Sequence, residues 1–456
     1  MKKIQLLFFI ILSLALTSCM SYYEMSAEYQ SELQNGNVDK ALKLVKKNKF
    51  LKKKRNHVLK LLEQGKLAHL NGDFTESNSY LNSVDSIFEL KQKHVADVFV
   101  ENFTNPEKTK YKAEDFEKVT IHYYKALNYY YLNNIEGAIV EAKRINLQLN
   151  EINDKYPADK KNRYKSDAFA HTLQGFLYEV NGDINNAFIA YRNAANLYLD
   201  NKDKTYLGVN IPPTLENDVL RTASQLGFYN EVSYFEKKFN RKFLSERIKG
   251  GELILIWEKG LIPYKDQTYF TFHMVPQSGV NFLDVYNNDL GISFPIPVDA
   301  NNKKSNYDVI NVAFAKYESR APYFSQAKVT SNNKSYTFEK LEDFDFIARK
   351  TLEDRRFREI AKAAARIATK KLAEYALKKE NDNLGTVLTA FNALNEKADT
   401  RNWQTLPQSL NYIRIPLNSG KNNIKITYTG ANGQTLERVL EIVGNGRVQI
   451  RNEFTF

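Results

Sequence analysis

The stretch from residue 168 to residue 199, AFAHTLQGFLYEVNGDINNAFIAYRNAANLYL, constrains the fold more than any other part of the sequence. Apolar residues recur at helical spacing on both sides of a Gly-Asp pair, which is a turn signal. Small residues at two matching positions would let two antiparallel helices approach closely, and tyrosines would fill the gap beside them. The small and aromatic positions are Gly175, Tyr178, Gly182, Ala187, Tyr191 and Ala194. The stretch therefore predicts a tightly packed helical hairpin.

The same pattern recurs at residues 58–90 and 119–149, with weaker copies near Gly36 and Gly227. These units resemble tetratricopeptide (TPR) repeats, although their spacing is uneven. They predict a TPR-like array of four or five helical hairpins over residues 24–245. Stacked hairpins form a concave surface suited to peptides or partner domains. The alternative is a helical scaffold that only positions another part of the chain.

The composition changes at Lys249-Gly250-Gly251, and residues 250–456 contain short apolar runs separated by Gly, Asn and Pro turns. Such runs predict an antiparallel β-sandwich or a barrel-like domain. A helical pair interrupts it at about residues 341–400. The predicted fold class is thus α+β and multidomain, with a TPR-like array followed by a β-rich domain.

The first inserted helix, residues 345–380, is basic and amphipathic, with an apolar stripe that includes Phe357, Ile360 and Ala364. A basic amphipathic helix can lie on an anionic membrane surface. It can equally pack on the sheet and leave its charged side in solvent. Both interpretations are open.

Residues 1–18 have the features of an export signal: two lysines, then an apolar run too short to span a bilayer. Leu16-Thr17-Ser18-Cys19 matches the lipobox, and the chain thereby resembles bacterial lipoproteins. The resemblance implies cleavage before Cys19, acylation of Cys19 and a short tether at residues 19–23. The alternative is a chance cysteine after an ordinary secretion signal. Because Cys19 is the only cysteine, a disulfide within the chain and a cysteine-ligated metal site are both excluded.

Met20 stands where an aspartate would favour the inner membrane in enterobacterial lipoproteins. We therefore expect a lipid anchor in the outer membrane that faces the periplasm, with the inner membrane and the cell surface not excluded. The net charge of +12 favours anionic lipid or peptidoglycan over nucleic acid as a partner. The basic run Lys52, Lys53, Lys54 and Arg55 either faces lipid head groups or is an exposed surface without a partner.

The sequence has a second resemblance, which covers nearly the whole mature chain. Besides the repeats, it depends on three segments: Glu258–Leu261, Phe294–Pro297 and Glu396–Pro407. With the repeats, they resemble an uncharacterised family of bacterial lipoproteins with N-terminal TPR-like repeats and a C-terminal β-rich domain. The family brings no catalytic residues with it. In the last segment, Asp399, Arg401 and Trp403 form a candidate recognition patch, with Arg401 for a carboxylate or phosphate and Trp403 for stacking. The alternative is that they pack structurally.

Motifs of catalysis are missing from the sequence: its six histidines lack zinc-site spacing, and it has neither a Gly-x-Ser-x-Gly elbow nor a Walker loop. We expect no catalytic residues, no metal and no cofactor. The sequence predicts a non-enzymatic adaptor or scaffold of the cell envelope, whose TPR-like groove binds an envelope protein. The alternatives are a membrane- or lipid-interacting protein that uses helix 345–380, and a hydrolase of envelope polymers.

Overall fold

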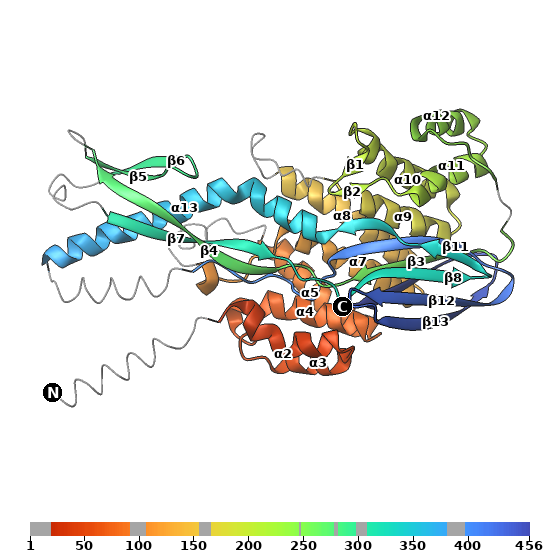
Figure 1. The fold of residues 1–456 in the computed structure, drawn as a ribbon, viewed down its shortest axis with the longest axis horizontal. Helices are drawn as coiled ribbons and strands as arrows, with labels where there is room; N and C mark the ends of the chain where they lie inside the picture. The colour runs from red at the N-terminus through yellow and green to blue at the C-terminus, as the bar shows by residue number, and fades with distance from the viewer. Residues whose placement is uncertain are drawn as a thin grey trace.

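The computed structural model describes residues 20–91, 106–154, 166–245, 248–277, 281–297, 308–380 and 397–456. The body of the protein has three layers (Figure 1). Helical hairpins from the first half of the chain cover one face of a central sheet, and a second sheet covers the other face. A third sheet, with one long helix, projects from the body as an arm. No helix in the described ranges is both long enough and apolar enough to span a membrane.

Within the described residues, the first half forms five helical hairpins. They are α2 (Tyr22–Gln34) with α3 (Val38–Lys47), α4 (His57–Leu70) with α5 (Phe74–Lys91), α7 (Asp115–Tyr131) with α8 (Ile135–Asp154), α9 (Ala168–Val180) with α10 (Ile184–Leu199), and α11 (Pro213–Gln225) with α12 (Tyr229–Phe239). Short 3₁₀ turns, η1 (Lys54–Asn56) and η3 (Pro106–Lys108), and a two-stranded ribbon, β1 (Thr205–Tyr206) with β2 (Val209–Asn210), lie in the connections.

Each hairpin turns through a residue with positive φ. These residues are Gly36, Gly72, Asn133, Gly182 and Gly227. In every case the next N–H donates back to a carbonyl in the first helix, as Asp183 does to Tyr178 (2.8 Å), which is the usual end of a helix at a left-handed residue. The repeated turn confirms the predicted array of helical hairpins.

Gly175 lies where the two helices of the fourth hairpin touch. A Cβ atom there would stand 2.2 Å from a ring carbon of Tyr191, so even a methyl group would push the helices apart. We expect Gly175→Ala to lower the free energy of unfolding by about 1–3 kcal/mol, measured by urea denaturation. Gly137→Ala in α8 is the comparison: its nearest neighbour would be the side chain of Asn134 at 3.0–3.1 Å, which accepts the N–H of Gly137 (2.9 Å), so we expect a smaller loss than at Gly175. Equal losses in the two variants would contradict this packing.

The central sheet has the strand order β10-β11-β3-β14. Its strands are β3 (Glu252–Lys259), β10 (Glu339–Asp343), β11 (Ser409–Pro416) and β14 (Val448–Thr455). Strand β3 is buried on both faces: Ile254 and Ile256 pack toward the helices, while Leu253, Leu255 and Trp257 pack toward the second sheet. Strand β14 runs parallel to β3, so the prediction of a purely antiparallel domain was wrong at this position.

The second sheet has the order β13-β12-β8-β9. Its strands are β8 (Phe324–Ser331), β9 (Lys334–Thr337), β12 (Gly420–Gly430) and β13 (Thr435–Gly444). Val329, Ile424, Ile426 and Tyr428 form a core with the central sheet. The two sheets make a sandwich rather than a closed barrel in the described residues, which corrects the barrel-like alternative.

The arm contains a sheet of order β6-β5-β4-β7. Its strands are β4 (Tyr264–Pro276), β5 (Phe282–Asn287), β6 (Ile292–Pro297) and β7 (Asp308–Glu318), and the helix on it is α13 (Phe344–Glu380). Ile360 and Ala364 of α13 are fully buried in the same core as Phe272, whereas Phe357 is 57% exposed. The apolar stripe of helix 345–380 is thus used mainly for packing on the sheet. The second helix of the predicted pair falls in residues 381–396, outside the described part.

Candidate functional site

The concave face of the helical array is occupied by the chain's own C-terminal half. The first helices of the hairpins face the central sheet and an extended stretch, residues 397–408, which we call the inner segment. Phe176 of α9 contacts Tyr412 of β11 with ring centroids 5.5 Å apart. Tyr130 and Tyr131 of α7 accept hydrogen bonds from the N–H groups of Ile450 (2.9 Å) and Asn452 (3.0 Å) in the edge strand β14. The predicted partner groove is therefore largely filled.

Buried carboxylates of the array hold the backbone of the inner segment. Glu117 of α7 accepts the N–H of Trp403 (2.6 Å), and Glu63 of α4 accepts the N–H of Gln404 (3.0 Å) and the hydroxyl of Thr405 (2.6 Å). Burial raises the pKa of Glu63. Burial also raises the pKa of Glu117 to about 7, against the opposing charge of Lys265.

Asp399, Arg401 and Trp403 lie together in the inner segment, but they face inward. Trp403 is 0% exposed and Arg401 is 1% exposed. The guanidinium of Arg401 donates to Asp399 (2.6 and 2.7 Å), to the side chain of Asn56 (2.7 Å) and to the carbonyl of Pro106 (3.0 Å). Arg401 and Trp403 have no surface left for an external ligand, and Asp399, whose side chain is 25% exposed, is already paired with Arg401. The prediction of a recognition patch was therefore wrong, and the structural alternative describes these residues.

A second buried polar cluster joins β3 to the array. Glu258 of β3 forms an ion pair with Lys66 of α4, and the two are 2% and 1% exposed. The hydroxyls of Tyr123 (3.4 Å) and Tyr124 (3.3 Å) donate to the same carboxylate. Burial lowers the pKa of Lys66, although Glu258 opposes the shift.

Arg414 of β11 joins the central sheet to the fourth and fifth hairpins. Its guanidinium contacts Glu179 of α9 (2.5 Å), Asp218 of α11 (2.9 Å) and Glu252 of β3 (3.0 Å). Arg221 pairs with Glu179 (2.6 Å) and Asp218 (2.9 Å) from the other side. Burial alone would raise the pKa of Glu179, but Arg414 and Arg221 lower it to about 2.

The lowered pKa of Glu179 predicts an acid-sensitive contribution to stability. Since the folded-state pKa lies below the ordinary value of 4.5, the stabilisation is present above pH 4.5 and is lost as the pH falls toward about 2. We expect the urea midpoint of the wild type to fall over this range and the profile of Glu179→Gln to be flatter. Parallel profiles in the two proteins would contradict the pairing.

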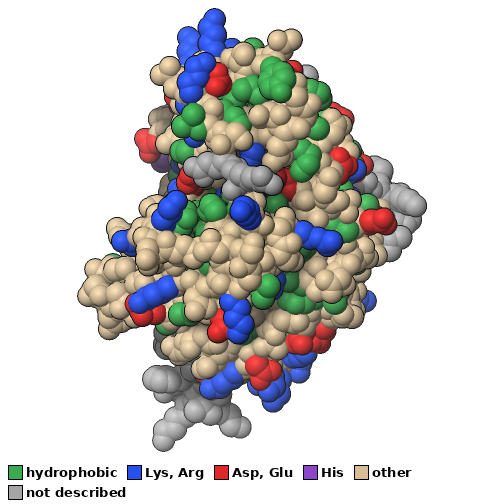
Figure 2. Space-filling view, turned by 90° about the vertical axis from the view of Figure 1, so that its right-hand side faces the viewer, with side chains coloured by type: hydrophobic (Ala, Val, Ile, Leu, Met, Phe, Trp, Pro, Cys, Tyr) green, Lys and Arg blue, Asp and Glu red, His purple; other side chains and the backbone are tan. Residues whose placement is uncertain are grey.

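A cleft of about 1370 Å³ opens where the sheet stops filling the concave face. It lies between α9 and α11, the beginnings of β3 and β14, and the connection after α12. Glu179, Arg221 and Arg414 line it together with the more exposed Arg241, Lys242 and Arg447. Figure 2 views the end of the molecule that is on the right in Figure 1, where basic side chains are spread among uncharged and acidic ones.

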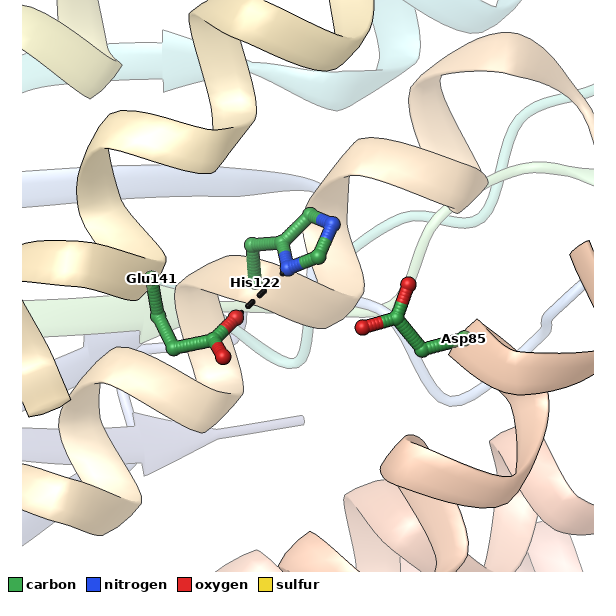
Figure 3. A group of neighbouring side chains, drawn as sticks. All are labelled: Asp85, His122 and Glu141. Atoms are coloured by element: carbon green, nitrogen blue, oxygen red, sulfur yellow. Dashed lines mark hydrogen bonds and ion pairs between the residues drawn. The ribbon is translucent and has the colours of Figure 1, made fainter. Parts of the chain in front are cut away.

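Asp85, His122 and Glu141 come close enough to suggest a metal site (Figure 3). However, the ammonium of Lys125 lies 2.9 Å from both Asp85 and Glu141. Arg144 also pairs with Asp85 (2.7 Å) and Glu141 (3.5 Å). The cluster is already neutralised, and it ties the second hairpin to the third.

This neutralisation predicts that stability is independent of metal. The melting temperature should stay the same after EDTA treatment and after addition of excess Zn²⁺, because Lys125 stands between the carboxylates that a cation would need. Thermal melts followed by circular dichroism test this. A fall of several degrees with EDTA that Zn²⁺ restores would show that a metal stabilises the fold and would contradict this prediction.

The remaining predicted residues have different surroundings. Gly182 forms a hairpin turn, and Tyr178, Ala187, Tyr191 and Ala194 are buried in the array. Lys52, Lys53 and Lys54 are exposed near η1, and Arg55 is half-buried. Cys19 lies outside the described residues. Sequence reasoning missed Glu63, Glu117, Glu179 and Arg414, whose role depends on contacts between distant segments.

No protein-family model matches the sequence, and no curated protein matches it. Among solved structures, MamA is similar at 16% identity with a TM-score of 0.28, over 46% of this chain and 91% of MamA. A Podosopora anserina putative kinesin light chain with nearly identical TPR-like repeats is similar at 12% identity with a TM-score of 0.31, over 47% and 92% of the two chains. The apo form of RapI is similar at 13% identity with a TM-score of 0.34, over 51% and 56%. These likenesses concern helical repeats and say nothing of what this chain binds.

Proposed function

We propose that the protein is a non-enzymatic adaptor that holds a polypeptide segment of an envelope partner in the cleft beside α9 and α11. The observation that carries the proposal is the division of the concave face. The chain's own inner segment and central sheet fill this face along α2, α4, α7 and most of α9. An open cleft remains beside the C-terminal end of α9 and along α11.

The inner segment illustrates how this face holds an extended chain. Carboxylates on the first helices accept backbone N–H groups, and Tyr124 contacts the ring of Trp403 edge-on, with centroids 5.9 Å apart. Along α11 the cleft presents Asn217, Arg221 and Ser224 at successive turns. The side chains of Asn217 and Ser224 can donate to and accept from a peptide backbone, whereas the guanidinium of Arg221 can only donate.

The charges of the cleft favour binding over catalysis. On its floor, Glu179, Glu252, Arg221 and Arg414 are joined in one ion-pair network. Groups that are paired in this way hold their geometry and are poor proton carriers. A hydrolase would need a base free to act on water or on a nucleophile.

The proposed location is the periplasmic face of the outer membrane, with acyl chains on Cys19 as the anchor. Leu16-Thr17-Ser18-Cys19 and the preceding apolar run support it. More than one acyl chain on Cys19 would suffice for stable anchoring. The exposed lysines 52–54 could add attraction to anionic head groups.

Site-specific photo-crosslinking in cells tests this function. A benzoylphenylalanine replaces Asn217 in the cleft or, as the control, Ser233 on the exposed side of α12. We expect one or two envelope proteins to be captured from position 217 and not from 233, identified by mass spectrometry. Capture that is equal at both positions, or absent at 217, would contradict binding in the cleft. The same experiment in a Cys19→Ser background shows whether the anchor is needed for the partner to be reached.

A further inference from the structure

In the described residues the sandwich has four edge strands, β9, β10, β13 and β14, and three of them are protected against pairing with another chain. Strand β9 has only four residues, and β10 has five, with a shift in its register. Two N–H groups of β14 donate to the hydroxyls of Tyr130 and Tyr131 in α7. Short strands, bulges and covered edges are usual means by which proteins keep an edge strand from pairing.

The fourth edge strand, β13, has none of these three protections in the part of the chain that the structure describes. It pairs with β12 through ten consecutive residues without a shift in register, and it contains no proline. Figure 1 shows β13 at the outer margin of the second sheet, where the sheet order ends. The edge is therefore long and regular.

The odd-numbered residues of β13 direct their backbone groups away from β12. In an antiparallel pair, successive residues alternate between facing the partner strand and facing outward. The N–H of Gly430 in β12 donates to the carbonyl of Gln434 (2.8 Å), so the even-numbered residues face β12. The carbonyl of Val443 accepts the side-chain amide of Gln449 in β14 (2.8 Å), which agrees with this alternation. Among the described residues, no hydrogen-bond partner is present for the outward backbone groups of Thr435, Glu437, Val439 and Glu441.

The side chains on the solvent face of this edge are acidic and apolar. Glu437 forms an ion pair with Lys425 of β12 (2.6 Å) and remains 53% exposed. Glu441 is exposed and forms no ion pair within the described ranges. Val439 lies between the two glutamates and is 59% exposed. A strand paired here would place alternate side chains beside these three residues.

The inner face of β13 is apolar and incompletely covered. Leu436 and Leu440 are partly buried against the core between the two sheets. Between them, the guanidinium of Arg438 turns back to the carboxylate of Glu453 (2.6 Å) and the carbonyl of Phe454 (3.1 Å) in β14. An added strand with apolar side chains on this face would extend the core over both leucines.

We propose that the edge of β13 from Thr435 to Glu441 binds an extended, basic segment of a partner protein, which joins the second sheet as a further strand. Main-chain hydrogen bonds supply affinity in this mode of recognition, and alternate side chains supply specificity. The segment carries lysine or arginine at positions four residues apart, beside Glu437 and Glu441, and apolar residues toward Leu436 and Leu440. A second copy of this chain, pairing through the same edge, would bring no cation to either glutamate. The edge is a binding surface separate from the cleft.

Hydrogen exchange in the presence of a synthetic peptide tests the proposal on the full-length protein. The peptide is Val-Lys-Val-Thr-Val-Lys-Val with blocked ends, and the control peptide has glutamate in place of both lysines. We expect the lysine peptide to bind about tenfold more tightly by fluorescence anisotropy, because cross-strand charge pairs replace like charges. It should also slow exchange in the fragment that contains residues 435–441 and leave the fragment with β9 unchanged.

Two variants separate backbone pairing from charge. Val439→Pro removes an outward N–H but keeps the ladder to β12, so it should fold normally and bind the lysine peptide about tenfold more weakly. Val439→Thr keeps the N–H and a branched side chain, and it should bind like the wild type. Glu441→Lys should lose most of the preference for the lysine peptide over the glutamate peptide. Circular dichroism melts show whether each variant is folded.

Three outcomes would overturn the proposal. One is unchanged binding of the lysine peptide to folded Val439→Pro. Another is an unaltered exchange rate in residues 435–441 at about 1 mM peptide, a concentration that detects even weak binding. The third is a dimer of the free protein, seen by sedimentation, that Val439→Pro dissociates, because the edge would then bind a second copy. If Val439→Pro does not fold, Glu441→Lys and the exchange data still decide. None of these results bears on crosslinking from the cleft.

Discussion

Arg414→Met should be among the most destabilising single substitutions in the chain. The guanidinium of Arg414 is 5% exposed and contacts three carboxylates from α9, α11 and β3. Removing it leaves Glu179 and Asp218 buried with Arg221 as their shared cation. Because an uncompensated buried charge is costly, we expect a loss of about 3–5 kcal/mol in the free energy of unfolding. Methionine keeps most of the side-chain volume, so the loss in the free energy of unfolding comes mainly from removal of the positive charge.

Urea denaturation followed by circular dichroism measures this loss. Lys328→Met in β8 is the control, because Lys328 is exposed and its replacement should change stability by no more than about 0.5 kcal/mol. Similar small effects from both substitutions would mean that Arg414 does not hold the sheet to the array.

Trp403→Ala should be comparably severe. The indole is fully buried where the inner segment crosses the array, and its N–H donates to Thr405 (3.1 Å). Truncation would remove a large apolar surface and leave a cavity between α7 and the sheet, so we expect a loss of about 3–5 kcal/mol.

The same substitution separates packing from recognition. A structural Trp403 predicts a lower urea midpoint together with increased exposure of the inner segment to protease. If Trp403→Ala kept the wild-type midpoint and lost only the binding of a ligand, the recognition patch would be correct after all. Tyr269→Ala, at a position that is 56% exposed, is the control for loss of an aromatic residue from the surface.

The parts of the fold that local chemistry determines could be predicted from the sequence. The hairpin turns depend on a glycine or asparagine with positive φ, and the close approach at Gly175 depends on one missing side chain. Asn332-Asn333, both with positive φ, is a further local signal, for the hairpin between β8 and β9. The parallel pairing of β14 with β3 had no local signal, because strand direction is set by the whole chain.

The role of the inner segment could not be read from the sequence for a similar reason. Asp399, Arg401 and Trp403 suit both recognition and packing. Glu117, which accepts the N–H of Trp403, lies 286 residues earlier in the chain, and Glu63, which accepts the N–H of Gln404, lies 341 residues earlier. Nothing in the sequence marks these two carboxylates among 53 acidic residues. Only the fold shows that the array uses its concave face to hold its own chain.

The measurement that tests this account most directly is hydrogen exchange, followed by mass spectrometry, on peptides that cover the inner segment. The N–H groups of Trp403 and Gln404 are bonded to buried carboxylates. We therefore expect them to exchange about as slowly as β3, through unfolding of the whole domain. Exchange as fast as that of an exposed loop would show that the concave face is free, and that the partner site extends well beyond the cleft.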